Sequence, residues 1–230
     1  MKKLILSSFT LVLITAATCF AQQKHELDIR LRAIDVDPQE SATIGVIGGG
    51  VKINHTIVPE LDFTYFFANN FSAELILATT RHTVSATSSN LSAIGGSSSA
   101  DVPLGKKWLL PPTLTLQYHA PTGSAVRPYL GAGVNYTIFY GGDPGPVVSS
   151  VSYKNHFSFA AQAGTDIDLS KQFFLNIDVK KIWLKTNVTV NASNLTPASS
   201  PQLAPVLANI PAAVKINPLV LGIGVGYRIK

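Results

Sequence analysis

The sequence predicts an all-β protein: an eight-stranded antiparallel transmembrane β-barrel with short periplasmic turns and long extracellular loops. Its mean hydropathy is positive, +0.26, yet no apolar run after the N-terminus reaches the ~18 residues that indicate a membrane helix. Eight segments alternate apolar and polar residues with a period of two, and their connections are alternately long and short. A transmembrane barrel explains these observations, because it distributes its lipid-facing side chains over alternate residues.

The N-terminus predicts a secretory signal peptide over residues 1–21. Two lysines precede an apolar run at 4–17, and the letters CFA that end the segment place small residues at the −3 and −1 positions of a cleavage site. The run is shorter than the ~20 residues of a membrane anchor, and Thr18 fits poorly before a lipidated Cys19. Cleavage would leave residues 22–230 as a single barrel domain without cysteine, so no disulfide or cysteine site is expected.

The first four segments each have one apolar and one polar face. Leu27–Val36 sets Leu, Ile and Ala against Asp and Arg, and Pro59–Phe67 sets Leu and aromatic residues against Glu, Asp and Thr. Phe71–Thr80 sets Phe, Ala and Leu against Ser and Glu, and Trp108–His119 alternates Leu and Tyr with Thr and Gln after two prolines. The polar faces carry too many charges for the dry core of a β-sandwich, so we expect the apolar faces to meet lipid.

The last four segments follow the same pattern. Arg127–Tyr140 alternates Leu, Ala, Val, Tyr and Ile with Gly, Asn and Thr, and Phe157–Leu169 sets Phe, Ala, Ile and Leu against Ser, Gln and Asp. Phe173–Thr186 sets Phe, Leu, Ile and Val against Asn, Asp and Lys, and Leu219–Ile229 sets Leu, Ile, Val and Tyr against Gly and Arg. Each segment is as long as a tilted membrane strand of ~9–11 residues, or slightly longer.

The connections and the aromatic residues indicate the orientation. Three connections are short (68–70, 120–126 and 170–172), and four are long and rich in Gly, Ser, Pro, Thr and Asn (37–58, 81–107, 141–152 and 187–213). In an outer-membrane barrel the short turns face the periplasm. Outward aromatic residues flank both ends of the barrel, as the aromatic girdles at membrane–water interfaces do. A soluble lipocalin-like barrel would instead turn its apolar residues inward and its charged residues outward. They are Phe67, Phe71, Tyr118, Phe173 and Tyr227 beside the short turns, and Trp108, Tyr140 and Trp183 beside the long loops.

Nearly every predicted strand carries a family likeness. The stretches are RLRAIDVDP (30–38), VPELDFTYFFANN (58–70), AELILATT (73–80), WLLPPTLTLQYH (108–119), RPYLGAGVNYTIFY (127–140), FFLNIDVKKIW (173–183) and VLGIGVGYRIK (220–230). Together they resemble the OmpW family of Gram-negative outer-membrane proteins. The resemblance implies location in the cell outer membrane and an eight-stranded barrel, monomeric or weakly associated, whose narrow and largely apolar lumen admits small hydrophobic molecules. The family usually ends in an aromatic residue that suits the barrel-assembly machinery, whereas this chain ends in Ile229 and Lys230.

The inward positions of the strands carry charges of both signs. A small barrel is filled by its own side chains, and an unpaired buried charge is costly. We therefore expect a salt-bridged plug in the periplasmic half, which would also serve as a polar floor that turns ligands sideways. The predicted plug residues are Asp28, Arg30, Arg32, Glu60, Asp62, Glu74, Asp166, Asp178 and Arg228.

Four other inward residues are candidates for the channel lining or its gate. By resemblance, Ile76 lies where the family narrows its lumen with an aliphatic side chain, and Lys180 lies where some relatives carry an aromatic one. Lys180 could instead simply pair with Asp178 or Glu74. Phe139 and Ile182 have inward parity near the outer rim, so they are expected to line an apolar vestibule.

The fourth strand contains two consecutive prolines, Pro111 and Pro112. Each removes a backbone donor, and the membrane offers no bulk water to the carbonyl that loses its partner. One interpretation is a bulge that tilts the strand end into its loop. The other is a lateral opening in the barrel wall.

No enzyme activity, cofactor or metal site is expected. Glu60 and Asp62 lie two residues apart on one face, but inward carboxylates are common in such a barrel and nothing else supports glycoside hydrolysis. The five histidines lack the spacing of a metal site, and His82 with the serines near it lacks the nucleophile motif of a lipid hydrolase. The net charge of +5, which two leader lysines inflate, does not indicate a nucleic-acid partner.

The expected function is a narrow channel for small hydrophobic molecules, with an apolar vestibule beneath the loops and lateral release into the bilayer above the plug. The alternative is a structural or interaction barrel with a closed lumen, whose extracellular loops bind surface partners or phage. The expected partners are outer-membrane lipid and lipopolysaccharide, small hydrophobic ligands and, during biogenesis, the barrel-assembly machinery.

Overall fold

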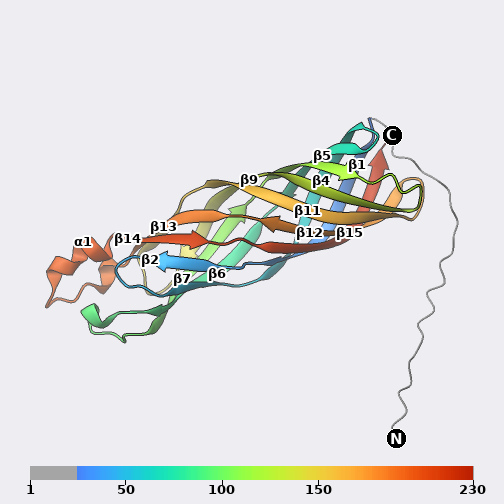
Figure 1. Cartoon of the computed structure of the whole chain (residues 1–230). Helices are drawn as coiled ribbons and strands as arrows, with labels where there is room; N and C mark the ends of the chain where they lie inside the picture. Colours follow the sequence, from blue (N-terminus) through green and yellow to red (C-terminus); the bar gives the residue numbers. More distant parts are fainter. Residues whose placement is uncertain (1–24, 230) are drawn as a thin grey trace, which may run out of the picture.

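A computed structural model describes residues 25–229, and eight of its strands close into an antiparallel barrel. The signal-peptide prediction, Cys19 and the C-terminal Lys230 lie outside these residues. Each barrel strand pairs with its neighbours along the chain, and β1 closes the barrel by pairing with β15 (Figure 1). The barrel strands are β1 (Leu27–Asp37), β4 (Thr56–Ala68), β5 (Phe71–Ala78), β8 (Thr113–His119), β9 (Val126–Pro144), β11 (His156–Asp168), β12 (Phe173–Ile182) and β15 (Leu219–Ile229). The predicted fold class is confirmed.

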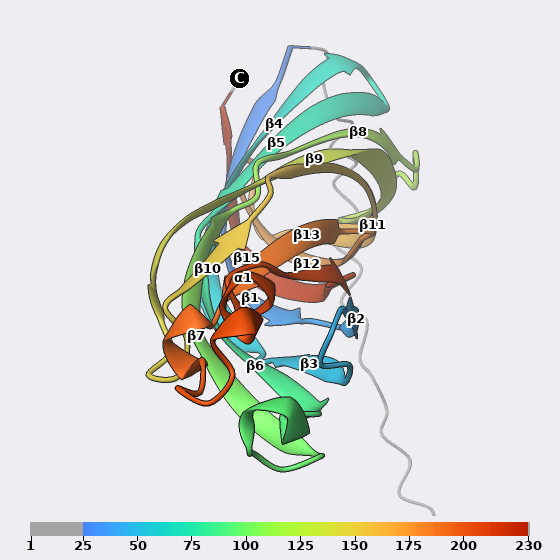
Figure 2. The same cartoon turned by 90° about the vertical axis from the view of Figure 1, so that its left-hand side faces the viewer.

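The four long connections fold into ordered structure at the end of the barrel opposite the C-terminus (Figure 1). Three strands extend the barrel sheet in the order β7, β6 and β3, and four others form a separate sheet in the order β10, β13, β14 and β2 (Figure 2). The additional strands are β2 (Ser41–Ile44), β3 (Gly50–Ile53), β6 (Thr80–Ser89), β7 (Ala100–Leu110), β10 (Ser150–Tyr153), β13 (Lys185–Asn191) and β14 (Ile210–Lys215). Short helices at Ser92–Ile94, Ser193–Leu195, Pro201–Leu203 and α1 (Ala204–Leu207) cap this end.

Two predicted strands are each divided in the structure. The segment Trp108–His119 becomes the end of β7 and the whole of β8, separated at Pro111 and Pro112, because neither proline can donate to a ladder. The segment Phe173–Thr186 is divided between β12 and β13. In both places the chain passes from the barrel into the outer structure, so the breaks mark where the barrel ends.

The burial pattern is that of a membrane barrel, apolar outside and polar inside. Outward residues such as Leu31 (56% exposed) and Leu116 (64%) face away from the protein, while Asp62 and Glu74 in the lumen are completely buried. Within residues 25–229, no helix is both long enough and apolar enough to cross a bilayer. Outward aromatic rings meet at both ends, for example Phe71 and Tyr118 with ring centroids 5.2 Å apart.

Glycine on the inner face of β15 makes room for large lumen side chains. A Cβ at Gly226 would lie 2.1 Å from the Phe174 ring, and a Cβ at Gly224 would lie 2.7 Å from Cγ of Arg32. The alternating glycines of this strand therefore allow its neighbours to fill the barrel.

Candidate functional site

The centre of the lumen is held by the guanidinium of Arg30 on β1. Its Nε lies 2.6 Å from Asp62 Oδ1 on β4, and its Nη2 lies 2.7 Å from Glu74 Oε1 on β5. Nη1 reaches Asp166 Oδ1 on β11 at 3.5 Å, and Nη2 also donates to the hydroxyl of Thr64. One side chain, 1% exposed, thus connects four strands across the barrel.

The next inward residue of β1, Arg32, forms the upper layer of the network. Its Nη2 lies 2.8 Å from Glu60 Oε1 and 3.0 Å from Asp62 Oδ2. The Lys180 ammonium on β12 adds longer contacts, 3.3 Å to Glu60 and 3.9 Å to Asp178. Glu60 is therefore shared by two cations, and Lys180 is the less tightly held of them.

The lower layer joins the strand ends near the short turns. Arg228 Nε lies 2.6 Å from Glu26 and 3.5 Å from Asp28, and its Nη2 lies 3.1 Å from Asp168. Arg127 Nη2 on β9 lies 2.9 Å from the same Asp168. All nine residues of the predicted plug lie within this connected network. The nine predicted residues omit Glu26 and Arg127, which precede or begin the strands where the alternation was counted, and Asp168, which ends β11.

The network contains more acids than bases. We refer to these thirteen charged residues as the plug: Glu26, Asp28, Glu60, Asp62, Glu74, Asp166, Asp168 and Asp178 with Arg30, Arg32, Arg127, Lys180 and Arg228. Neutral side chains supply further bonds: Gln162 and Gln117 donate to Glu74 at 2.5 and 2.7 Å. No cluster suited to a metal ion occurs among residues 25–229.

An apolar cavity, the inner pocket, lies directly above the plug. It has a volume of about 70 Å³, and its floor is formed by Glu60 and Lys180. The other predicted channel residues, Ile76, Phe139 and Ile182, also lie on its wall. The structure therefore brings together the four residues that the sequence proposed from parity and resemblance.

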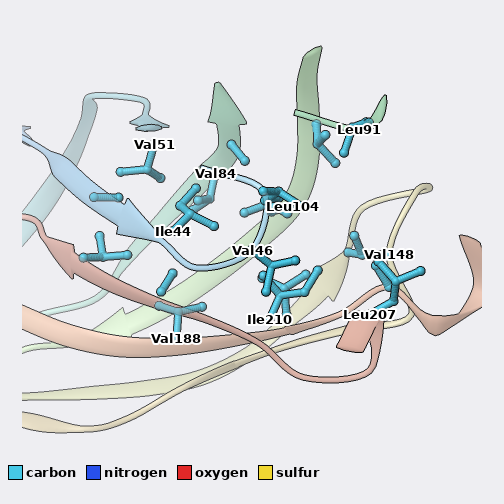
Figure 3. A pocket seen from close by; sticks show the side chains of 18 of the residues that line it. Ile44, Val46, Val51, Val84, Leu91, Leu104, Val148, Val188, Leu207 and Ile210 are labelled. Carbon is cyan, nitrogen blue, oxygen red and sulfur yellow. The ribbon is translucent and has the colours of Figure 1, made fainter. Parts of the chain in front are cut away.

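A second cavity, the outer pocket, lies between the two sheets at the outer end and has a volume of about 120 Å³ (Figure 3). Ile44 (β2), Val84 (β6), Val188 (β13) and Ile210 (β14) point into it from opposite walls, and Leu207 of α1 lies at one end of it, beside Val148 (Figure 3). Sequence reasoning missed this pocket, although apolar residues alternate in each of these short strands.

The two pockets are neighbours and share part of one wall. Ile53, Val84, Tyr153 and Ile216 line both of them. The Tyr153 ring stacks on Phe139 with centroids 5.3 Å apart. Burial raises the pKa of Tyr153 to about 12, so its hydroxyl, which is neutral at physiological pH even in an exposed tyrosine, adds no charge to the path.

The two prolines lie where the barrel ladder is interrupted on one side. The pairing of β5 with β8 ends at Ile76 and Thr113, and the pairing of β6 with β7 starts at Thr80 and Leu109. Among the described strands, no ladder pair joins residues 77–79 to residues 110–112.

The opposite side of the prolines is closed. The Tyr136 amide donates to the Pro112 carbonyl at 3.0 Å, and the Asn135 side chain donates to the Pro111 carbonyl at 3.0 Å. Pro111 also lines the inner pocket. The interruption is therefore confined to the β5 side, at the height of that pocket.

Comparison with known proteins identifies the family. The sequence profile of the OmpW family matches residues 23–229. The chain belongs to the OmpW family. It is 39% identical over 201 residues to the uncharacterized outer-membrane protein y4mB of Sinorhizobium fredii, covering 87% of this chain and 78% of that protein. It is 29% identical to outer membrane protein W of Escherichia coli, covering 99% of this chain and 100% of that protein.

Solved structures agree with the family assignment. The crystal structure of outer membrane protein OprG from Pseudomonas aeruginosa superimposes with a TM-score of 0.76 at 27% identity, covering 91% of this chain and 98% of that one. The OmpW-family barrel described here is therefore an outer-membrane protein.

Proposed function

We propose that this OmpW-family barrel conducts small, uncharged, apolar molecules from the cell exterior into the outer membrane. The observation that carries the proposal is that two neighbouring apolar pockets with a shared wall lie above a plug of buried charges. A molecule would enter the outer pocket, pass the shared wall at Tyr153 and rest in the inner pocket. No catalytic step is involved.

The plug favours a sideways exit. A straight path to the periplasm would require the separation of ion pairs such as Arg30 with Asp62, at 2.6 Å, and an apolar molecule offers those charges no replacement. The one-sided gap at Pro111 and Pro112 offers the alternative, because an opening there breaks no ladder bond on the β5 side. The prolines thus support the lateral interpretation more than a simple bulge.

Uptake measurements test the proposal. Cells with and without the protein would be given an apolar solute and a polar solute of similar size, and we expect faster uptake of the apolar solute alone. In Ala86→Trp, the indole would occupy the outer pocket, which Ala86 lines with 2% of its surface exposed. Leu116→Trp, on the lipid-facing surface, is the matched control. Equal apolar uptake with and without the protein would contradict the channel.

The ordered outer structure favours a second candidate, a closed barrel that binds surface partners or phage. A flexible loop would not fold into the four-stranded sheet of β10, β13, β14 and β2. This candidate predicts that the Ala86→Trp variant changes neither solute uptake nor partner binding, since the outer surface of the sheet is unaltered. A monomeric state and delivery by the barrel-assembly machinery are part of both candidates.

A further inference from the structure

The outward face of the four-stranded outer sheet carries lysines without acidic neighbours. Lys185 on β13 and Lys215 on β14 are direct cross-strand partners, and both are exposed. Opposite residues of an antiparallel pair have Cβ atoms roughly 5 Å apart, and like charges in such positions repel. An anion bound between the two ammonium groups would offset this repulsion and stabilise the sheet.

A third lysine completes a triangle. Lys154 follows β10, and its amide donates to the Asn187 carbonyl at 3.0 Å, so Lys154 lies opposite Asn187 and diagonal to Lys185. Diagonal neighbours are roughly 7–8 Å apart. Asn187, together with Ser41 beside Lys215, adds neutral donors to the same face.

No carboxylate neutralises the triangle. The sequence has no Asp or Glu at 144–165 or after residue 178, and within residues 25–229 the ammonium groups of Lys154, Lys185 and Lys215 form no ion pair. The nearest acid along β2, Glu40, accepts the Ile53 amide at 3.0 Å and so turns towards β3. The opposite wall differs, because Arg81 there pairs with Asp143 at 3.0 Å.

The position of the three lysines along the barrel axis, relative to the outer aromatic girdle, indicates their ligand. Lys185 lies two residues, or roughly 7 Å, beyond Trp183 on the same face of the chain. Trp183 is 49% exposed and belongs to the outer aromatic girdle, which marks the boundary of the hydrocarbon. The lysines therefore stand at the level where the phosphates of an outer-leaflet lipid lie.

We propose that Lys154, Lys185 and Lys215 form a docking site for the phosphate groups of a phosphorylated outer-leaflet glycolipid. The lipid would lie against the outer sheet with its acyl chains below Trp183 and its phosphates between the lysines. This site is independent of the channel, because the lysines lie on the opposite face of the sheet from the outer pocket.

Native mass spectrometry of the purified full barrel in detergent tests the site with bis-phosphorylated lipid A as the probe. A lysine near an anionic lipid surface contributes about fivefold to binding. We expect affinity to fall about a hundredfold in Lys154→Gln/Lys185→Gln/Lys215→Gln and about fivefold in Lys185→Gln or Lys215→Gln alone. The single variants keep the test valid if the triple variant fails to fold, which heat-modified gel mobility would reveal.

The control triple lies on the opposite wall and has the same number of cations removed: Lys52→Gln/Arg81→Gln/Lys106→Gln. It should weaken binding by less than about threefold. An equal loss in both triples would mean that only net charge matters, and equal binding of lipid A without phosphate would exclude phosphate recognition; either overturns the proposal. Full displacement of the lipid by millimolar inorganic phosphate would assign the site to free phosphate and overturn it as well.

Discussion

Replacing Arg30 with methionine removes the cation at the centre of the plug while keeping the unbranched chain that leads to it. Arg30 is 1% exposed, and the change would leave Asp62 and Glu74 without contacts of 2.6 and 2.7 Å. Both carboxylates still contact Arg32, at 3.0 and 3.2 Å. They therefore lose one of their two guanidinium partners but keep the other. The excess of carboxylates in the plug would also rise by one.

The expected cost is about 3–5 kcal/mol of unfolding free energy, the range for breaking a buried ion pair from one side. Urea unfolding in lipid vesicles would measure it through tryptophan fluorescence, since both tryptophans, Trp108 and Trp183, lie at the outer edge of the barrel. Adding Glu74→Gln to Arg30→Met should cost less than the sum of the two single changes, because the second change removes one of the carboxylates left behind.

Arg81→Met is the matched control. Its ion pair with Asp143 has a similar length, 3.0 Å, but both side chains are exposed, at 39% and 78%. Removing a solvated pair costs at most about 1 kcal/mol. If Arg30→Met is no more destabilising than Arg81→Met, the plug is not a tightly coupled network and the blocked floor loses its physical basis.

Two further predictions concern transport, and a third concerns the stability of the barrel. Pro111→Val/Pro112→Val would restore two donors and close the gap, so apolar uptake should fall severalfold in correctly inserted protein; unchanged uptake would remove the gap from the mechanism. Ala86→Trp should slow apolar uptake while Leu116→Trp leaves it unchanged, and equal rates in the two variants would exclude the outer pocket as the entrance. Lys180→Leu should destabilise the barrel less than Arg30→Met, because Glu60 keeps Arg32 at 2.8 Å, and urea unfolding compares the two directly.

The barrel and its plug were predictable because the membrane enforces a strict alternation. Asp62 and Glu74 could be assigned to the lumen by parity alone, since a charge on the lipid-facing side would be costly. The pairing of these acids with Arg30 rather than Lys180 was not predictable, because parity gives the face of a residue and not its partner. The choice of partner depends on how closely the strands approach, and Arg30 is separated from Asp62 by 32 residues and from Glu74 by 44 residues in the sequence.

The outer structure was predicted only as loops. Residues 188–190 and 214–216 have the alternation of strands, but β13 and β14 are short and their surroundings are rich in Pro, Ala and Ser. The pairing of β14 with β2 joins Val214 to Ala42, which are far apart in the chain, so no local pattern encodes it. The outer pocket depends on that pairing and was therefore missed.

Ligand chemistry follows from how the plug and the pockets are stacked. A charged molecule would lose its hydration in the outer pocket, whose wall is almost entirely aliphatic, before it could reach Lys180 or Glu60. An uncharged apolar molecule gains about 25 cal/mol for each Å² of surface that it removes from water in either pocket. At the floor it meets buried ion pairs such as Lys180 with Glu60, to which an apolar molecule offers no replacement contact, so further descent is unfavourable. Beside Pro111 the barrel wall borders the hydrocarbon of the membrane, where the apolar surface of the molecule also stays out of water. Exit through the side of the barrel is therefore more favourable for an apolar molecule than passage through the plug.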